Sequence, residues 1–328
     1  MKLVFDIGGT KLRRAVIGDR GEFITTDERP SGGDLKGALE ALSQEAIAKY
    51  PIDFVGACFA GHAFENRILS APNIDLGALK GVDFAAWIKE RFGLLGAIDN
   101  DLKCAALAEA ADRPQVSALF ALYIGTGIGG SYVENGALIR GANNNAGEIG
   151  HIPFEKTPFL CGCGGEMCLE SSASGAALNK WREYYGLNDR PLNAPKASAS
   201  NDRRDHCGFT DRTPNELNAY KDGGEAAAGG GRDRREPKTL SALAASDNPL
   251  AREIAERFYR GVDHAVQTIA SLFNPQVIAL GGGVALAEPS VLTRAQAAVG
   301  GAYKPSRLVA IELTRLGDKA NLLGASLL

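Results

Sequence analysis

The sequence has no long hydrophobic run and no large excess of charge of one sign. Its longest apolar runs, such as residues 118–124, are far shorter than the about 18–20 residues that a membrane-spanning helix requires. The formal net charge is only -3, which gives no basic surface for nucleic acid or for an anionic membrane. We therefore expect neither a membrane nor a nucleic acid among the partners of the protein.

Cysteine is scarce as well. Six cysteines in 328 residues are too few for a disulfide scaffold, and the three apolar residues ahead of Asp6 are too few for the core of a secretion signal. Both features favour a reduced, cytoplasmic protein. The length and the 45% hydrophobic content are sufficient for about two domains with large buried cores.

Glycine, in contrast, is abundant, with 40 residues or about 12% of the chain against about 7% in average proteins. Three glycine clusters follow predicted strands, and such turns point backbone N–H groups at phosphate oxygens. One such turn is typical of an ordinary hairpin, but three, two of them with an adjacent threonine, favour a nucleoside triphosphate. None has the Walker pattern, and the first two lead into strands, unlike a Rossmann turn. The candidate nucleotide-binding residues are Gly8, Gly9, Thr10, Lys11, Gly125, Thr126, Gly127, Gly129, Gly130, Gly281, Gly282 and Gly283.

A unit of strand, glycine turn and strand occurs twice, beginning at residues 2 and 117. This repetition predicts two similar α/β lobes that face each other across a cleft. We place the N-terminal lobe at residues 1–113 and the C-terminal lobe at 114–314, with a C-terminal helix at about 315–328 that packs back on the first lobe.

Apolar spacing predicts the other elements. The segment 196–238 differs from all of them, because 17 of its 43 residues are charged and six are glycine. We expect it to be a disordered surface insertion. The predicted helices are 34–49, 84–92, 102–111 and 250–272, and the predicted strands include 2–7, 53–59, 94–98, 117–124 and 276–280.

Three polar residues, Asp99-Asn100-Asp101, stand where a strand is predicted to meet the helix at 102–111. One capping residue would be enough for that helix. A carboxylate at this point could instead accept the proton of a substrate hydroxyl that attacks a γ-phosphoryl group. Asp6, at the end of the first strand, leaves a similar choice between a turn-forming residue and a water-mediated Mg²⁺ ligand.

Four potential metal ligands lie close together in the sequence: His151, Cys161, Cys163 and Cys168. Three thiolates and one imidazole make a complete tetrahedral set for Zn²⁺. Because four protein ligands leave no open position, we predict a structural zinc in the loop 151–168. The other cysteines are interpreted as core thiols, Cys58 and Cys104, and as a bystander in the insertion, Cys207.

Two glutamates flank the metal loop. Glu148 and Glu170 are ordinary surface residues by default, but a zinc ion that fixes the loop between them would aim both at one ligand. Carboxylates bind sugar hydroxyls well, at roughly 1.5–3 kcal/mol for each charged hydrogen bond. His62 could line the same cleft or lie on the surface.

Six motifs follow one another along the chain: DIGGTK at 6–11, DND with AALAE at 99–109, IGTGIGG at 124–130, GEIGH at 147–151, CGCGGEMCLE at 161–170 and ALGGGV at 279–284. In order and spacing they resemble the motif series of the ROK sugar kinases over nearly the whole chain, with the insertion left out. The zinc loop with its trailing glutamate is specific to that family. The glycine turns alone are shared with the wider actin, Hsp70 and hexokinase fold.

The resemblance implies two duplicated ribonuclease-H-like lobes of the actin/hexokinase type, a homodimer, and transfer of the γ-phosphoryl group of ATP, with Mg²⁺, to a hexose or N-acylhexosamine. It implies Asp101 as the catalytic base. The chain departs from the family at Ala60 and His62, at Ser131, and at Leu102-Lys103, where small or polar residues are commoner. The residues implied to hold the sugar are Gly61, Asn73, Asn100, Asp101, Glu148, His151 and Glu170.

Within the family, the start of the DND helix and the segment YYGLNDRPLNAP are most similar to N-acetylglucosamine kinases, which predicts phosphorylation of N-acetyl-D-glucosamine to its 6-phosphate. Glucokinase, N-acetylmannosamine kinase and fructokinase share every motif and remain alternatives. The candidate acetamide pocket is the run 143–146.

Two other classes of protein compete with the enzyme. A sugar-sensing ROK regulator carries an N-terminal winged helix-turn-helix, for which a glycine turn at residue 8 leaves no room. An actin-like filament or chaperone would have no use for sugar-facing glutamates at positions 148 and 170.

Overall fold

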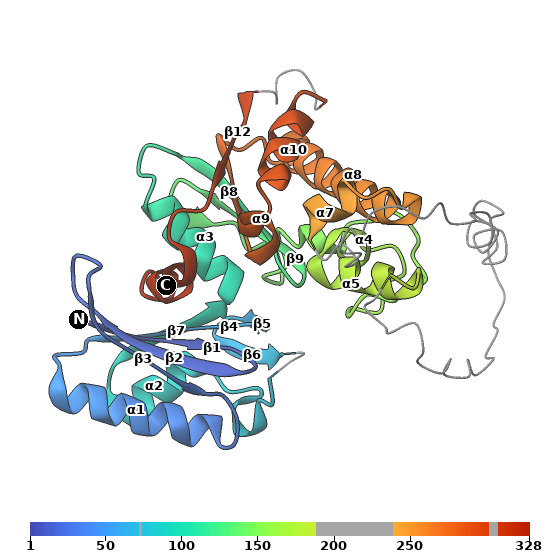
Figure 1. Ribbon diagram of the computed structural model, residues 1–328. Helices are drawn as coiled ribbons and strands as arrows, with labels where there is room; N and C mark the ends of the chain where they lie inside the picture. Colours follow the sequence, from blue (N-terminus) through green and yellow to red (C-terminus); the bar gives the residue numbers. More distant parts are fainter. Residues whose placement is uncertain (72–73, 188–238, 302–307) are drawn as a thin grey trace, which may run out of the picture.

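The computed structural model describes residues 1–71, 74–187, 239–301 and 308–328 (Figure 1). Three predictions therefore lie outside the described residues: the sugar contact of Asn73, the bystander Cys207 and the insertion at 196–238.

Two five-stranded sheets form the two lobes. The first has the order β3-β2-β1-β4-β7, with β1 at Lys2–Ile7, β2 at Lys11–Ile17, β3 at Phe23–Pro30, β4 at Phe54–Phe59 and β7 at Leu95–Asn100. The second has the order β10-β9-β8-β11-β12, with β8 at Ala118–Ile124, β9 at Ile128–Glu134, β10 at Ala137–Leu138, β11 at Val277–Gly281 and β12 at Ala310–Leu313.

The two sheets have the same topology. In each, the first strand along the chain pairs antiparallel with the second and parallel with a third on its other side: β1 with β2 and β4, and β8 with β9 and β11. The predicted two-lobed, duplicated α/β fold is confirmed. The division of the chain at residue 114 stays a prediction.

Helices cover both sheets. The helices predicted at 34–49, 84–92, 102–111 and 250–272 agree with observed helices to within one residue, whereas the C-terminal helix predicted at about 315–328 spans only 320–325. Two short strands, β5 at His62–Phe64 and β6 at Arg67–Ser70, form a separate hairpin. The helices are α1 Leu35–Lys49, α2 Phe84–Phe92, α3 Asp101–Ala111, α4 Glu170–Ala173, α5 Gly175–Tyr184, α7 Leu240–Ala244, α8 Pro249–Leu272, α9 Gly283–Ala287, α10 Pro289–Val299 and α11 Ala320–Ala325.

The alternation of side chains along β1 separates two cores. Leu3, Phe5 and Ile7 belong to the cluster with α1 and α2, whereas Val4 belongs to the cluster with α3 and α11. Because successive strand residues point to opposite faces, Asp6 shares the face of Val4. The buried Asp6 carboxylate therefore faces the layer between the lobes.

Helices α3 and α11 lie between the two sheets (Figure 1). The helix α11 contacts α3, β1 and β4, although it comes from the far end of the chain. Gly324 permits this approach, because a Cβ atom there would collide with the backbone carbonyl of Cys104. On the other face of α3, Ala106 packs with Leu119 and Ala121 of β8.

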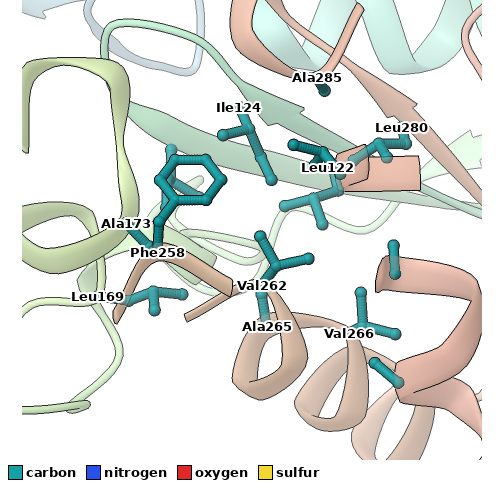
Figure 2. Packing of buried hydrophobic residues seen from close by; sticks show 14 of the residues in the cluster. Leu122, Ile124, Leu169, Ala173, Phe258, Val262, Ala265, Val266, Leu280 and Ala285 are labelled. Atoms are coloured by element: carbon teal, nitrogen blue, oxygen red, sulfur yellow. The ribbon is translucent and has the colours of Figure 1, made fainter. Parts of the chain in front are cut away.

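The largest core lies in the second lobe and is built on α8. Figure 2 shows Phe258 and Val262 of this helix beside Leu122 and Ile124 of β8. β8 alternates in the same way as β1, since Leu119 and Ala121 point toward α3. Each lobe thus has its own core, and the α3–α11 layer joins them.

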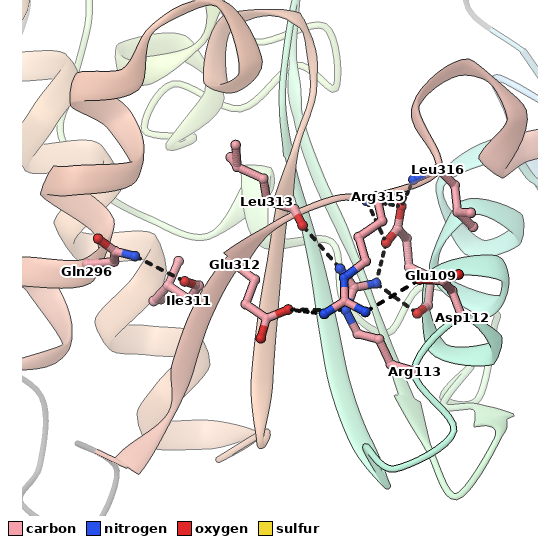
Figure 3. Close-up of polar contacts among 9 residues, drawn as sticks. All are labelled: Glu109, Asp112, Arg113, Gln296, Ile311, Glu312, Leu313, Arg315 and Leu316. Atoms are coloured by element: carbon pink, nitrogen blue, oxygen red, sulfur yellow. Dashed lines mark hydrogen bonds and ion pairs between the residues drawn. The ribbon is translucent and has the colours of Figure 1, made fainter.

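A buried ion pair on α3 holds the segment 313–316, which leads from β12 toward α11 (Figure 3). The side chains of Glu109 and Arg113 are both 0% exposed and bond to each other. Glu109 also accepts hydrogen bonds from the backbone N–H groups of Arg315 and Leu316, each at 3.0 Å, and Arg113 donates to the Leu313 carbonyl at 3.1 Å. This network fixes the segment that leads from β12 to α11.

We expect Glu109→Gln to lower the free energy of unfolding by about 3–5 kcal/mol, because it leaves the buried Arg113 charge with only the partly exposed carboxylate of Glu312. Chemical denaturation at neutral pH measures the loss. The control is Glu312→Gln, which removes a carboxylate 40% exposed and 3.4 Å from Arg113 and should cost less than about 1 kcal/mol. Equal losses in the two variants would contradict the role of the buried pair.

Within the ranges that the structure describes, every helix is too short or too polar to span a lipid bilayer.

Candidate active site

A cavity of about 680 Å³ opens between the two lobes. This volume is in the range of small-molecule sites. Its lining combines three parts of the chain: the hairpin after β4, the start of α3 and the loop that leads into the metal cluster. The lining residues are Ala60, Gly61, His62, Ser70, Asn100, Asp101, Lys103, Asn144, Asn145, Glu148, His151 and Cys163.

The junction of β7 and α3 presents Asp101 to this cavity. Asn100 is the N-cap, and its side-chain oxygen accepts hydrogen bonds from the backbone N–H groups of Leu102 at 2.9 Å and Lys103 at 3.3 Å. Its amide donates to the Gly61 carbonyl at 3.0 Å. Capping thus accounts for Asn100, whereas Asp101 accepts a hydrogen bond from the Leu102 N–H through Oδ1 at 2.9 Å. Its second oxygen remains available to a ligand.

The surroundings of Asp101 make it a stronger base than an ordinary carboxylate. Burial and, next, the charge of Asp6 raise the pKa of Asp101 to about 6, with a smaller contribution from Glu148. The hydrogen bond from the Leu102 N–H acts in the opposite direction. A carboxylate with this pKa is ionised at pH 7 and holds a proton more readily than a solvated one.

The run 143–146 joins the two lobes at the edge of the cavity. Asn144 is buried, and its amide donates at 2.8 Å to both the Ala63 carbonyl and Asp99 Oδ1. His62 Nε2 lies 2.9 Å from the Asn143 carbonyl. Asn144 is therefore held by protein partners through its amide nitrogen, and Asn145 lines the cavity beside it.

The four predicted metal ligands are together. The ligand atoms of His151, Cys161, Cys163 and Cys168 all lie within 4.8 Å of one another. Cys161 Sγ is 3.6 Å from His151 Nδ1, and the Sγ atoms of Cys163 and Cys168 are 3.5 Å apart. Tetrahedral Zn²⁺ with bonds of about 2.3 Å to sulfur would separate its sulfur ligands by about 3.8 Å. The donor set and its spacing fit zinc.

Backbone pairing holds the two ends of the metal loop together. Phe154 N–H donates to the Met167 carbonyl at 2.8 Å, and Leu169 N–H donates to the Ile152 carbonyl at 3.0 Å. The loop therefore returns Cys168 beside the segment that follows His151. This closure places His151 and Cys163 in the wall of the cavity that contains Asp101.

Glu170 lies apart from this cavity lining. Its Oε2 accepts the Ile128 N–H at 2.9 Å, and its Oε1 is 3.7 Å from Cys161 Sγ. The carboxylate thus connects the second glycine turn with the metal loop. Its contact with Cys161, whose Sγ is 3.6 Å from His151 Nδ1, places Glu170 beside the metal cluster.

The second and third glycine turns meet at another cavity, of about 550 Å³. Gly125 and Thr126 line it together with Gly283. Gly282 has φ +90°, and a Cβ atom there would collide with the backbone of Ile124. Only glycine therefore allows β11 to turn into α9 so close to the end of β8.

The first glycine turn is not part of either cavity lining. Its Lys11 pairs with Glu28 at 2.7 Å. At the adjacent strand end, the Asp6 carboxylate bonds to Arg13, and its Oδ1 lies 3.5 Å from Cys58 Sγ. Both oxygens of Asp6 thus have protein partners, and the predicted contact to Mg²⁺ through water stays a prediction.

Several residues that line the two cavities were missed in the sequence. Ser70 carries no local signal, whereas Asn144 and Asn145 belong to the run 143–146 that the sequence singled out. Lys103 was noted in the sequence only as a departure from the family pattern after the DND motif. In the second cavity the missed residues come from the starts of α5 and α7, from α9 and from the residue after it: Gly175, Ala176, Leu178, Asn179, Thr239, Leu240, Val284, Ala287 and Glu288. Ser174 and Thr239, the N-caps of α5 and α7, are local signals for helix starts there.

The two remaining cysteines are core residues, as predicted. Cys58 on β4 and Cys104 on α3 are both fully buried. Burial raises the pKa of both thiols, so neither is a reactive thiolate.

The family model described as the ROK family matches residues 3–328. The chain belongs to the ROK family. A glucokinase from Streptomyces coelicolor is 27% identical to this ROK protein over 334 residues, covering 98% of this chain and 95% of the relative. An N-acetyl-D-glucosamine kinase from Vibrio vulnificus is 30% identical over 220 residues, covering 61% of this chain and 72% of the relative.

A solved structure also matches this ROK family chain. It is described as a ROK family glucokinase from Streptomyces griseus in complex with glucose and AMPPNP. The two chains are 26% identical with a TM-score of 0.65, and the match covers 99% of this chain and 97% of that chain. Both the sequence relatives and the solved structure are kinases of sugars.

Proposed function

We propose that this sugar kinase of the ROK family transfers the γ-phosphoryl group of ATP to a hexose or N-acylhexosamine, with Asp101 as the general base. The observation that carries the proposal is the cavity between the lobes. Asp101 lies in one wall and Glu148 and His151 in the other, so one small carbohydrate can contact both.

Asp101 supplies the proton chemistry. A sugar hydroxyl transfers its proton to the free oxygen of Asp101 while the hydroxyl oxygen attacks the γ-phosphorus and ADP leaves. The raised pKa favours this transfer, because a base titrating near 6 is still ionised at neutral pH. Asn100, Gly61 and Glu148 would fix the sugar by hydrogen bonds that its hydroxyls make.

The second cavity is the proposed nucleotide site. Its backbone at Gly125, Thr126 and Gly283 would bind phosphate oxygens through N–H groups, and α5 and α7 would flank the nucleoside. Mg²⁺ would be held mainly by the phosphates of ATP. A contact through water from Asp6, and phosphate contacts from Gly8, Gly9, Thr10 and Lys11, stay predictions.

A structural zinc is the proposed occupant of the cysteine–histidine cluster. His151 would bind it through Nδ1, the ring atom that lies near Cys161, which leaves Nε2 for a sugar hydroxyl. The ion would therefore stabilise the loop and orient one sugar ligand. A sugar contact from Glu170, and a homodimer, stay predictions.

N-acetyl-D-glucosamine is the proposed substrate, with formation of its 6-phosphate. The support is the similarity to N-acetylglucosamine kinases and the polar run at 143–146, which lines the cavity together with His62. Glucose, N-acetylmannosamine and fructose are the alternatives, and the glucokinase relative covers more of the chain. The named relatives, all sugar kinases, do not favour a transcriptional regulator.

An ADP-release assay over a sugar panel tests this proposal. The panel contains N-acetylglucosamine, N-acetylmannosamine, glucose, fructose and allose, with kcat/KM measured for each. We expect the highest kcat/KM for N-acetylglucosamine. If kcat/KM is highest for glucose, the proposed substrate is wrong but the proposed reaction stands. If no sugar causes ADP release, the proposed reaction is contradicted.

A further inference from the structure

We propose that Lys103 is a sugar-contacting specificity residue, and that its ammonium and the carboxylate of Glu148 hold one hydroxyl of a neutral sugar between them. The inference rests on the proposed sugar kinase function and names the chemical class of substrate that this site selects.

The position of Lys103 is unfavourable for a lysine. It lies in the first turn of α3, its side chain is only 2% exposed, and it lines the cavity of Asp101. Burial of an ammonium group is costly, and a cation at a helix N-terminus opposes the positive end of the helix dipole. Because helix stability does not favour lysine here, we infer that its charge serves the cavity.

The partner of Lys103 lies across the cavity. Within the ranges that the structure describes, Glu148 is the one carboxylate within ion-pair distance, with Oε1 3.7 Å from Lys103 Nζ. A direct charged hydrogen bond would measure about 2.7–2.9 Å. An oxygen that enters the cavity beside this pair can lie at about 2.8 Å from both groups. Such an oxygen would accept a hydrogen bond from the ammonium and donate one to the carboxylate.

A sugar hydroxyl can do both, because it is a donor and an acceptor. An anionic substituent cannot, since it has no proton to donate to Glu148. It would also meet two carboxylates, Asp101 and Glu148, against one ammonium. The charges that line the cavity therefore select a neutral sugar with a free hydroxyl at the position between Lys103 and Glu148, and disfavour sugar acids and sugar phosphates.

The test compares the wild-type chain with Lys103→Met, which keeps the side-chain length and removes the charge. Calorimetric titration without nucleotide gives the Kd of glucose and of its 2-deoxy, 3-deoxy and 4-deoxy analogues, and ADP release gives kcat/KM for the same sugars. Lys49→Met, on an exposed part of α1, is the matched control. Thermal unfolding verifies that each variant is folded.

We expect the wild type and the control to bind one of the three deoxy sugars about 100-fold more weakly than glucose, since loss of that hydroxyl removes the oxygen that bonds to both the buried ammonium and Glu148. In Lys103→Met, glucose should bind about 100-fold more weakly, and that deoxy sugar should bind about as well as glucose. The KM for ATP should not change. A merely structural role of Lys103 would weaken all sugars by the same factor.

Deoxy-sugar ratios that are the same in Lys103→Met as in the wild type would overturn the inference. A raised KM for ATP with unchanged sugar constants would also overturn it, because the ammonium would then serve the phosphates. A failure of the proposed function would give a different result. The wild type would then bind sugars with the expected pattern but release no ADP with any of them.

Discussion

Asp101→Asn is expected to lower kcat by roughly 10²–10⁴-fold, or about 3–5 kcal/mol of activation free energy, with little change in sugar binding. The amide keeps the hydrogen bond to the Leu102 N–H, so the start of α3 should be unchanged. It cannot accept the proton of the attacking hydroxyl. Steady-state ADP release and sugar titration measure the two effects separately.

The same substitution should stabilise the folded protein. The pKa of Asp101 is raised from 3.8 to about 6, so the folded state binds this proton more tightly than the unfolded state does. The ionised carboxylate therefore destabilises the fold above pH 6, and the effect disappears below pH 4. At pH 7, Asp101→Asn should raise the free energy of unfolding by at most about 3 kcal/mol. Denaturation at pH 7 and pH 4 tests this.

The activity of the wild type should fall with acid in the corresponding range. Because the base must be ionised, kcat/KM should decrease about tenfold per pH unit below about 6. The control for both experiments is Asp112→Asn, at the far end of α3, whose kcat and pH profile should match the wild type. An unchanged kcat in Asp101→Asn would remove this residue from the mechanism.

Cys163→Ala is expected to abolish stoichiometric zinc binding. The variant keeps three of four ligands but loses the closed tetrahedral set, and binding of a structural zinc contributes about 10–16 kcal/mol in small zinc-binding peptides. The loop 151–168 should then unfold at a lower temperature than the rest of the chain. Sugar binding should weaken as well, because the zinc fixes the orientation of His151.

Metal analysis of the purified protein and thermal unfolding measure these losses. The matched control is Met167→Ala, an exposed residue of the same loop, which should retain zinc and sugar affinity. Full zinc occupancy in Cys163→Ala would exclude this cysteine from the site. An absence of zinc in the wild type would exclude the metal.

Local patterns predicted the parts of this molecule that depend on neighbours in the sequence. The apolar segment of β1 and the helical spacing of α1 predicted their bounds closely. The metal ligands were found because they all lie in one short segment, 151–168, so the loop itself brings them together. Cys58 and Cys104 were assigned to the core from their apolar surroundings alone.

Contacts between segments far apart in the sequence were harder to predict. The hydrogen bond from the Ile128 N–H to the Glu170 carboxylate joins two such segments and could not be inferred from the sequence, whereas the sugar contact of Glu170 stays a prediction. Lys103 stood out in the sequence without a role, because neither its burial nor its distance from Glu148 can be inferred from an adjacent residue. The second cavity unites the glycine turns after β8 and β11, which are far apart in the sequence, with α5 and α7.

By itself, the sequence determined the duplicated strands, the glycine turns, the helix caps and a ligand set for one metal ion, because each depends on chain geometry over a few residues. Only the tertiary structure decided that the Glu170 carboxylate accepts the Ile128 N–H, that Glu109 and Arg113 bind the segment before α11, and that Lys103 is buried beside Glu148. The reason is physical. The energies of these contacts come from packing and charge between segments that the order of residues leaves far apart.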